Sequence, residues 1–485
     1  MKLVLVNPRN PVSLYGDYLW QPLALAYIAA ATPSGWDVEL IDEQCEGQVD
    51  YERVDADLVG LTAFTTQAPH AYRIAQRLRA RGIPVVMGGI HASMLPDEAA
   101  RYVDAVFVGE GETVWPQLVA DFESGNLRAR YIGPTNATDM IRPDRSIFAK
   151  YPYAYASAQT SRGCPMDCSF CSVTAFNGRL FRMRDVDDVV SELASIPERD
   201  VILVDDDLNG FSRKAKERCL ALFRAMAAAR LDKQWITQVT INFGDDDELP
   251  RLARAAGCVG VFIGLESTDT KSLTLIRKDG TSQRRGVPYY LENLARIRRQ
   301  GIGVVGSFII GIDTQDMNTI ADDILAFTDD SELDGFNPTI LTPLPGTRDY
   351  ARFDAEHRIL FKNYPDDWER YTLAFPVTHH DKISGAGLMR RYVQLLQFFR
   401  PERIAERYWR THDTVSPEAA WHAFLWNRVW SNYCLRGGVY RHSPLAAAYP
   451  AEVPCDVPAR PVRPSLPPDT IAMSRPSHRE GPSLP

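Results

Sequence analysis

The chain has 485 residues, 45% of them hydrophobic, and a formal net charge of -8. This length and composition predict roughly three domains with separate cores, and the acidic balance argues against a dedicated nucleic-acid binder, which would carry a basic face. No apolar run approaches the roughly 20 residues that span a bilayer, and Met1–Val6 reads as a strand without signal-peptide architecture, so we expect a soluble, cytoplasmic protein.

Short apolar runs alternate with helical stretches over about the first 130 residues. Helical stretches such as His70–Arg81 separate the runs. This alternation predicts an α/β domain over residues 1–135, with a Rossmann-like, doubly wound parallel sheet and helices on both faces. The predicted strands are Lys2–Asn7, Asp37–Asp42, Leu58–Thr62, Pro84–Gly88 and Ala105–Val108.

Glycines and small polar residues gather where these strands end. In open parallel sheets, ligands bind beyond the carboxyl ends of the strands, and glycine lets the backbone approach a large ligand closely. Taken alone, the pattern is equally typical of a flavodoxin-like or response-regulator-like scaffold. The residues that we expect at such a ligand site are Asn7, Thr62, Thr65, Gly88, Gly89, His91, Gly109 and Glu110.

Three cysteines follow the next extended segment with the spacing CxxxCxxC: Cys164, Cys168 and Cys171. Iron-sulfur clusters are held by thiolates, and this spacing can bind three irons of a four-iron cluster while the fourth iron lacks a protein ligand. A structural zinc site would need four ligands, yet no histidine follows closely and the other cysteines show no partner spacing. Disulfides would need an even set and an oxidising compartment.

The spacing CxxxCxxC with an aromatic residue before the last cysteine, here Phe170, resembles the signature of the radical S-adenosylmethionine (SAM) superfamily. The resemblance implies that SAM chelates the open iron of a [4Fe-4S] cluster. An electron from the reduced cluster would then cleave SAM and give a 5'-deoxyadenosyl radical, which attacks unactivated C–H bonds. The resemblance also implies an external electron donor such as flavodoxin or ferredoxin.

A second alternation of strands and helices covers residues 155–350, after a linker over residues 136–154. Six such units suit the partial (β/α)6 barrel of TIM type found in radical SAM enzymes, whose sites lie at the C-terminal ends of the strands. The predicted strands are Tyr155–Thr160, Val201–Val204, Ile236–Ile241, Gly260–Gly264, Gly303–Ile310 and Asn337–Leu341.

Polar or small residues follow these strands, and the resemblance assigns several to the SAM site. Asp205 or Asp206 would contact the SAM amino group or face the substrate, with a solvated turn or a magnesium site as alternatives. Gly264 and Glu266 match a Gly-x-Glu strand end near SAM, although such a glutamate is often just an acid at a helix N-terminus. The other candidate SAM residues are Phe170, Gln238, Ile310 and Gly311.

In company with the cysteine motif, residues 1–130 resemble the cobalamin-binding domain of the cobalamin-dependent branch of this family. The most specific segments are Pro22–Tyr27, Gly88–His91 and Gly109–Glu112. The loop Asn7–Tyr18 has no histidine where methionine-synthase-type domains carry a DxHxxG motif, so cobalt would lack that ligand. His91 would line the pocket or bond a corrin amide, with cobalt ligation and a structural role as alternatives.

The rest of the chain changes character twice. Residues 351–450 are helical and aromatic in pattern and predict a C-terminal domain that caps the open barrel and helps to define the substrate pocket. Residues 451–485 are rich in proline and poor in large apolar residues, so we expect a disordered tail.

The resemblance implies a methyltransferase that acts on an unactivated carbon of a small-molecule or lipid substrate. One SAM would methylate cob(I)alamin, a second would yield the radical, and the substrate radical would collect the methyl group from methylcobalamin. One alternative is a cobalamin-dependent radical cyclase, rearrangement or oxidation enzyme without methyl transfer. Another is a non-catalytic cobalamin or redox sensor.

Overall fold

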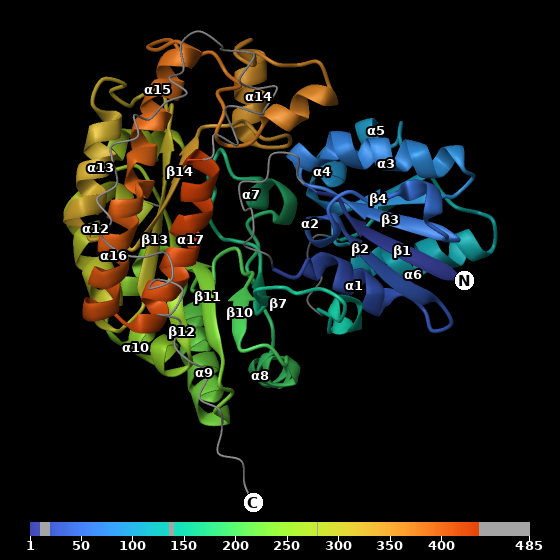
Figure 1. The fold of residues 1–485 in the computed structure, drawn as a ribbon, viewed down its shortest axis with the longest axis horizontal. Coiled ribbons are helices and arrows are strands. Elements are labelled where there is room, and N and C mark those ends of the chain that lie inside the picture. The colour runs from blue at the N-terminus through green and yellow to red at the C-terminus, as the bar shows by residue number, and fades with distance from the viewer. Residues whose placement is uncertain (10–19, 135–139, 279, 436–485) are drawn as a thin grey trace, which may run out of the picture.

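The computed structural model describes residues 1–9, 20–134, 140–278 and 280–435. Figure 1 shows two lobes side by side, each built around its own parallel sheet. The residues predicted to form the C-terminal tail, 451–485, lie outside the described residues.

The first lobe contains a six-stranded, fully parallel sheet in the order β2-β1-β3-β4-β5-β6. This architecture confirms the predicted Rossmann-like α/β fold. The strands are β1 (Lys2–Asn7), β2 (Asp37–Asp42), β3 (Leu58–Thr62), β4 (Val85–Gly88), β5 (Ala105–Val108) and β6 (Arg130–Ile132). The edge strand β6 was not predicted, because it has three residues and only the middle side chain is buried.

Alternating side chains of the strands build a core on each face of this sheet. In β1, Leu3 and Leu5 belong to one core, and Val4 and Val6 belong to the other. The first core lies under α1 (Leu23–Ala31) and α6 (Gly111–Glu123), and the second lies under α3 (Ala68–Ala80). Helices therefore cover both faces of the sheet, and its strand ends stay available for a site.

The second lobe holds another six-stranded parallel sheet, in the order β14-β13-β12-β11-β10-β7. The edge strands β7 and β14 do not pair with each other, which confirms the predicted partial barrel. The main helices between its strands include α8 (Val186–Ser195), α9 (Arg213–Ala229), α10 (Glu248–Ala255), α12 (Gly280–Arg299) and α13 (Ile320–Asp330). The strands are β7 (Ala156–Ala158), β10 (Asp200–Leu203), β11 (Gln234–Val239), β12 (Cys258–Glu266), β13 (Gly303–Ile310) and β14 (Gly335–Ile340).

The first strand of this sheet ends earlier than the apolar run predicts. The predicted strand Tyr155–Thr160 contains only Ala156–Ala158 as β7. Thr160 and Ser161 leave the sheet because they donate hydrogen bonds to the buried carboxylate of Asp205. The chain then forms a second, two-stranded sheet of β8 (Ser161–Arg162) and β9, Arg182–Met183.

The C-terminal region is helical, as predicted, apart from a mostly irregular segment between its first two helices. The α-helices are α14 (Arg348–Ala355), α15 (Gly385–Leu395), α16 (Pro401–Thr414) and α17 (Pro417–Leu435). Helix α17 contacts β12, β13 and β14, and its His422 lies against Tyr155 beside β7. The last helix thus reaches both edges of the open barrel (Figure 1). In the described part of the chain, no helix is long and apolar enough to cross a membrane.

Asp313 anchors this region to the end of β13, and its ion pairs predict a pH dependence. Its carboxylate accepts hydrogen bonds from Arg358 at 2.6 Å and Arg352 at 3.0 Å. Burial alone would raise the pKa of Asp313, but the two guanidinium groups outweigh it and lower the pKa to about 2. The carboxylate therefore contributes about 2 kcal/mol at neutral pH, and this contribution is lost as the pH falls from about 4 towards about 2.

We expect the free energy of unfolding of the native chain to fall more steeply than that of the Asp313→Asn variant between about pH 4 and about pH 2. Urea unfolding across this pH range measures the difference. Parallel curves for the two proteins would contradict the assignment.

Candidate functional site

The three cysteines lie in the loop that joins β8 to β9, and this loop includes α7 (Ser172–Asn177). Gly163, the residue before the first cysteine, has a φ of 85°. A Cβ atom there would lie 2.1 Å from the carbonyl oxygen of Leu180, so only glycine fits between the two arms of the loop. The antiparallel strands bring both ends of the cysteine loop together.

Consecutive aspartates after β10 bind the start of this loop. Asp205 accepts hydrogen bonds from the backbone N–H of Thr160 at 3.0 Å and the hydroxyl of Ser161 at 2.6 Å. Asp206 accepts one from the backbone N–H of Gly163 at 2.9 Å. Sequence reasoning placed Asp205 or Asp206 against SAM or the substrate, whereas the structure directs both carboxylates to the cysteine loop. This geometry favours a positioning role.

Asp207, the third acid of this run, contacts a cysteine itself, although the sequence assigned no role to it. Its Oδ2 is 4.0 Å from Sγ of Cys164, and its Oδ1 accepts a hydrogen bond from the hydroxyl of Thr240 at 3.3 Å. Burial raises the pKa of Asp205 and of Asp207 to about 6. The signal in the sequence was the unbroken run of three acids after a strand, whose individual partners only the fold reveals.

Glu266 and Lys278 form a buried ion pair beside the cysteines. Oε1 of Glu266 lies 3.4 Å from Nζ of Lys278, and a Cβ at Gly264 would lie 2.3 Å from that oxygen. The Gly-x-Glu strand end thus makes room for the pair. The pKa of Lys278 is raised because Glu266, Cys168 and Cys164 together outweigh the lowering effect of burial. The sequence analysis missed Lys278, which follows α11 (Thr270–Leu275) and carries no motif of its own.

The donor set fits an iron-sulfur cluster with three protein ligands. Burial raises the pKa of Cys168 to about 12 and raises the pKa of Cys164 and Cys171 as well, so iron must displace the thiol protons on binding. The ammonium of Lys278 offsets the negative charge that three thiolates bring. Among the described residues, no group of three or more His, Cys, Asp or Glu side chains could hold a single metal ion. A four-iron cluster does not need such a group, because each thiolate binds a different iron.

The other candidate SAM residues differ in access. Gln238 lies at the C-terminal end of β11 with an exposed side chain. Ile310 is fully buried, so a ligand could meet only its backbone, and Gly311 follows it with a φ of 89°. Phe170 is partly buried and packs against the apolar core of the C-terminal region.

In the first lobe, two of the predicted glycines are explained by packing inside the domain. A Cβ at Gly88 would lie 1.9 Å from the ring of Phe107, and one at Gly89 would lie 2.5 Å from Oγ1 of Thr62. Asn7, at the end of β1, donates a hydrogen bond to Asp42 at 2.9 Å. Contacts within the domain therefore explain both glycines without a ligand. Most of the Asn7–Tyr18 loop lies outside the described residues.

His91 is buried and has a partner at each ring nitrogen. Its Nε2 lies 3.1 Å from Oε1 of Glu98, and its Nδ1 lies 3.4 Å from Oγ1 of Thr65. The ring edge also meets the indole of Trp368, whose Nε1 donates a hydrogen bond to Glu98 at 3.0 Å. Of the roles considered for His91, this geometry favours the structural one, in which the histidine helps to join the first domain to the C-terminal region.

The strand ends of the first sheet nevertheless face the cysteine loop. Helix α4 (Gly89–Met94), which starts at the end of β4, packs against α7 at the junction of the lobes (Figure 1). After β3, the side chain of Phe64 is 69% exposed. Phe64 is thus an exposed aromatic side chain at the carboxyl edge of the sheet, where sheets of this kind bind their ligands. Gly109 and Glu110 follow β5, and Glu110 turns its carboxylate to the second lobe.

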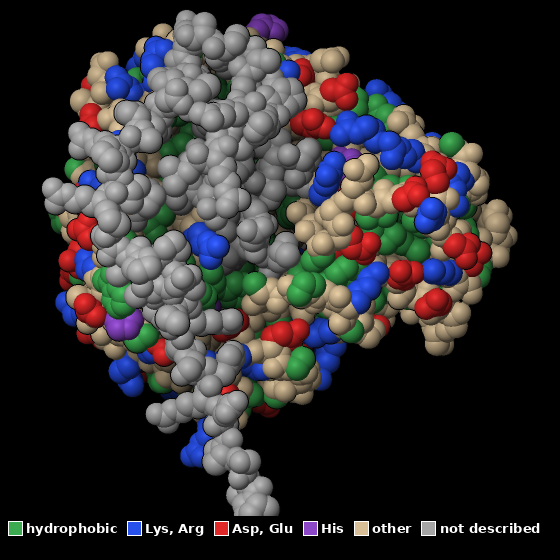
Figure 2. Space-filling view, viewed as in Figure 1, with side chains coloured by type: hydrophobic (Ala, Val, Ile, Leu, Met, Phe, Trp, Pro, Cys, Tyr) green, Lys and Arg blue, Asp and Glu red, His purple; other side chains and the backbone are tan. Residues whose placement is uncertain are grey.

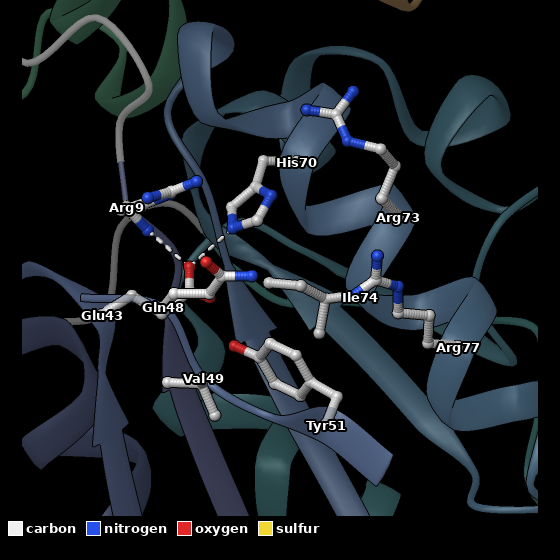
Figure 3. A pocket seen from close by; sticks show the side chains of 9 residues that line it. All are labelled: Arg9, Glu43, Gln48, Val49, Tyr51, His70, Arg73, Ile74 and Arg77. Carbon is white, nitrogen blue, oxygen red and sulfur yellow. Dashed lines mark hydrogen bonds and ion pairs between the residues drawn. The ribbon is translucent and has the colours of Figure 1, made fainter. Parts of the chain in front are cut away.

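A cavity of about 210 Å³ lies elsewhere on the first lobe, between α3 and the segment after α2 (Glu43–Glu46), as Figure 3 shows. At its base, Glu43 accepts a hydrogen bond from the backbone N–H of Arg9 at 2.8 Å and contacts His70 at 2.7 Å. None of the predicted cofactor residues lines this cavity. Figure 2 shows basic and acidic side chains interspersed over the visible face of this lobe.

Comparisons with known proteins match both lobes. Residues 12–119 match the B12 binding domain family, and residues 159–326 match the radical SAM superfamily. The chain is 28% identical over 409 residues to the bacteriochlorophyllide d C-12(1)-methyltransferase of Chlorobaculum tepidum, with 81% of this chain and 86% of the relative covered. It is 26% identical to the anaerobic magnesium-protoporphyrin IX monomethyl ester cyclase of Rubrivivax gelatinosus, with 85% and 80% covered.

Among solved structures, the radical S-adenosylmethionine methyltransferase TsrM from Kitasatospora setae, with cobalamin and a [4Fe-4S] cluster bound, shares the fold. The TM-score is 0.59 at 18% sequence identity, and the match covers 81% of each chain.

The cysteine loop lies at the strand ends of an open parallel barrel, and the barrel domain matches the radical SAM superfamily. Together these two findings define a radical SAM domain. The B12 binding domain that precedes it places the chain in a narrower group. The chain thus combines the two domains that characterise the cobalamin-dependent radical SAM enzymes, one from the B12 binding family and one from the radical SAM superfamily.

Proposed function

We propose that this chain is a cobalamin-dependent radical SAM methyltransferase that methylates an unactivated carbon of a small-molecule or lipid substrate. The observation that carries the proposal is the junction of the lobes, where the strand ends of the B12 binding domain face the cysteine loop. When bound, the cofactors supply a carbon-centred radical on one side of the junction and a methyl group on the other. Reacting groups held in this way need no diffusion between steps.

Different residues of the chain would bind the cluster, position the cysteine loop and contact SAM. Cys164, Cys168 and Cys171 would hold the cluster, and Asp205 with Asp206 would fix the backbone that carries them. The strand end at Gln238 and the Gly264–Glu266 segment would border SAM. An external carrier such as flavodoxin or ferredoxin would bring the electron, because the cysteine motif supplies ligands for a single cluster.

A second candidate function is radical cyclisation or oxidation without methyl transfer, and the relative from Rubrivivax gelatinosus named as a cyclase supports it. The relative from Chlorobaculum tepidum named as a methyltransferase supports methyl transfer. At 28% and 26% identity the two relatives are about equally similar to this chain, so the products of the reaction must separate the two functions.

Anaerobically reconstituted chain, supplied with cobalamin, a low-potential reductant and SAM labelled with deuterium in its methyl group, separates these functions. Methyl transfer predicts labelled methyl on the bound cobalamin together with S-adenosylhomocysteine. Formation of 5'-deoxyadenosine without either product would favour the second candidate. Absence of any SAM cleavage would contradict both enzymes and favour a sensor. Mass spectrometry of the small molecules measures all of these outcomes.

A further inference from the structure

Glu110 places a buried carboxylate of the first lobe against the second lobe. It follows β5 and precedes α6, and its side chain is only 2% exposed. Its Oε2 lies 2.9 Å from Nη1 of Arg162, and its Oε1 forms an ion pair with Arg182. Both oxygens of this one carboxylate therefore bind guanidinium groups of the radical SAM domain.

The two arginines occupy matched positions on either side of the cysteine loop. Arg162 in β8 and Arg182 in β9 are direct partners in the antiparallel register. Arg162 comes two positions before Cys164, and the loop with all three cysteines connects the two strands. Glu110 thus binds both arms of the ribbon from which the cysteine loop projects.

The buried charges around Glu110 favour a negatively charged side chain at this position. Arg162 also pairs with Glu112 at 2.6 Å, and its guanidinium lies over the ring of Tyr27 with 5.4 Å to the centroid. Two cations and two anions are thus gathered where the side chains are 2% to 11% exposed. Removing one charge from such a buried set leaves another without compensation, so the set has one favoured arrangement.

We propose that Glu110 is a positioning residue that locks the cysteine loop to the cobalamin-binding domain and so fixes the separation between cluster and cobalt. This inference rests on the proposed function, in which a radical and a methyl group must reach one substrate carbon. Displacements of about 1 Å are enough to slow such reactions strongly. The role differs from the direct cobalamin contact predicted for Glu110, because both carboxylate oxygens already face arginines.

The test compares the Glu110→Gln variant with a matched control, Glu123→Gln, at the far end of the helix that Glu110 precedes. Glu123 accepts a hydrogen bond from Nε1 of Trp36, and this bond lies entirely within the first lobe. Dipolar electron paramagnetic resonance between cob(II)alamin and the reduced cluster reports their separation. We expect E110Q to broaden the distance distribution about twofold or to shift its centre, while E123Q keeps the native distribution.

A native distribution in E110Q that retains both cofactors would overturn the proposal, even if methyl transfer is confirmed. Where E110Q fails to retain them, the milder Arg182→Lys variant is measured by the same criterion. Hydrogen exchange of the cofactor-free chains gives a readout independent of function. We expect the backbone amides of residues 163–171 to exchange about tenfold faster in E110Q than in E123Q. Equal exchange rates in the two variants would also overturn the proposed role of Glu110. A native chain that locks its loop yet transfers no methyl group would contradict only the proposed function.

Discussion

Replacing any one of Cys164, Cys168 and Cys171 with alanine is expected to abolish 5'-deoxyadenosine formation while cobalamin binding continues. Each thiolate would hold a different iron, and loss of one leaves a site that cannot retain an intact four-iron cluster. The cobalamin-binding domain has its own sheet and its own two cores, so it folds independently of these side chains. Activity should fall by at least about 1,000-fold, since the radical has no other source.

Cys45→Ala is the matched control, because Cys45 lies in α2 of the first lobe and belongs to a different domain. Iron and sulfide analysis, the absorbance of the cluster and its spin signal in the reduced state measure loading. Product analysis by mass spectrometry measures SAM cleavage. Full cluster loading, or undiminished 5'-deoxyadenosine formation, in an alanine variant of the motif would contradict the assignment.

The Asp205→Asn variant is expected to destabilise the cysteine loop by about 3 kcal/mol and to lower cluster loading several-fold. Asp205 is fully buried and accepts hydrogen bonds from two consecutive residues, Thr160 and Ser161. An asparagine has one acceptor oxygen and an NH2 group that would face N–H donors. Arg218, which donates to the carbonyl oxygen of Thr160 at 2.9 Å, would also lose the negative charge that acts on it most strongly.

Asp187→Asn provides the comparison, because Asp187 is an exposed residue in the first turn of α8. Urea unfolding measures stability, and iron content per chain measures loading in both variants. A D205N chain as stable and as well loaded as D187N would show that the buried carboxylate does not hold the loop.

Strands buried on both faces were the easiest elements to predict from the sequence. β1, β3 and β5 have the predicted bounds because continuous apolar runs between polar residues leave few alternatives. The edge strand β2 also has the predicted bounds, although its first three residues are not buried. The edge strand β6 escaped prediction because Arg130 and Ile132 face solvent and show no apolar run. The predicted end at Thr160 failed for a different reason, since a tertiary contact with Asp205 draws the backbone out of the sheet.

The candidate site divides in the same way. The cysteines were found because their spacing alone specifies the chemistry. Lys278 and Asp207 were missed because they act through neighbours that are distant in sequence, namely Glu266 and Cys164. Glu110 was found from the residues around it, but its partners Arg162 and Arg182 depend on how the two lobes dock. A single sequence carries no direct record of such docking.

The reach of α17 across the open barrel has a consequence for biosynthesis. β14 is complete at Ile340, but the helix that contacts it and also meets Tyr155 extends only from Pro417 to Leu435. A nascent chain therefore keeps the opening between β7 and β14 free of α17 while roughly a hundred further residues are translated, and the apolar side chains that this helix later covers stay exposed for that time. We therefore expect ribosome-bound chains truncated before Pro417 to bind chaperones more strongly than chains that extend through Leu435.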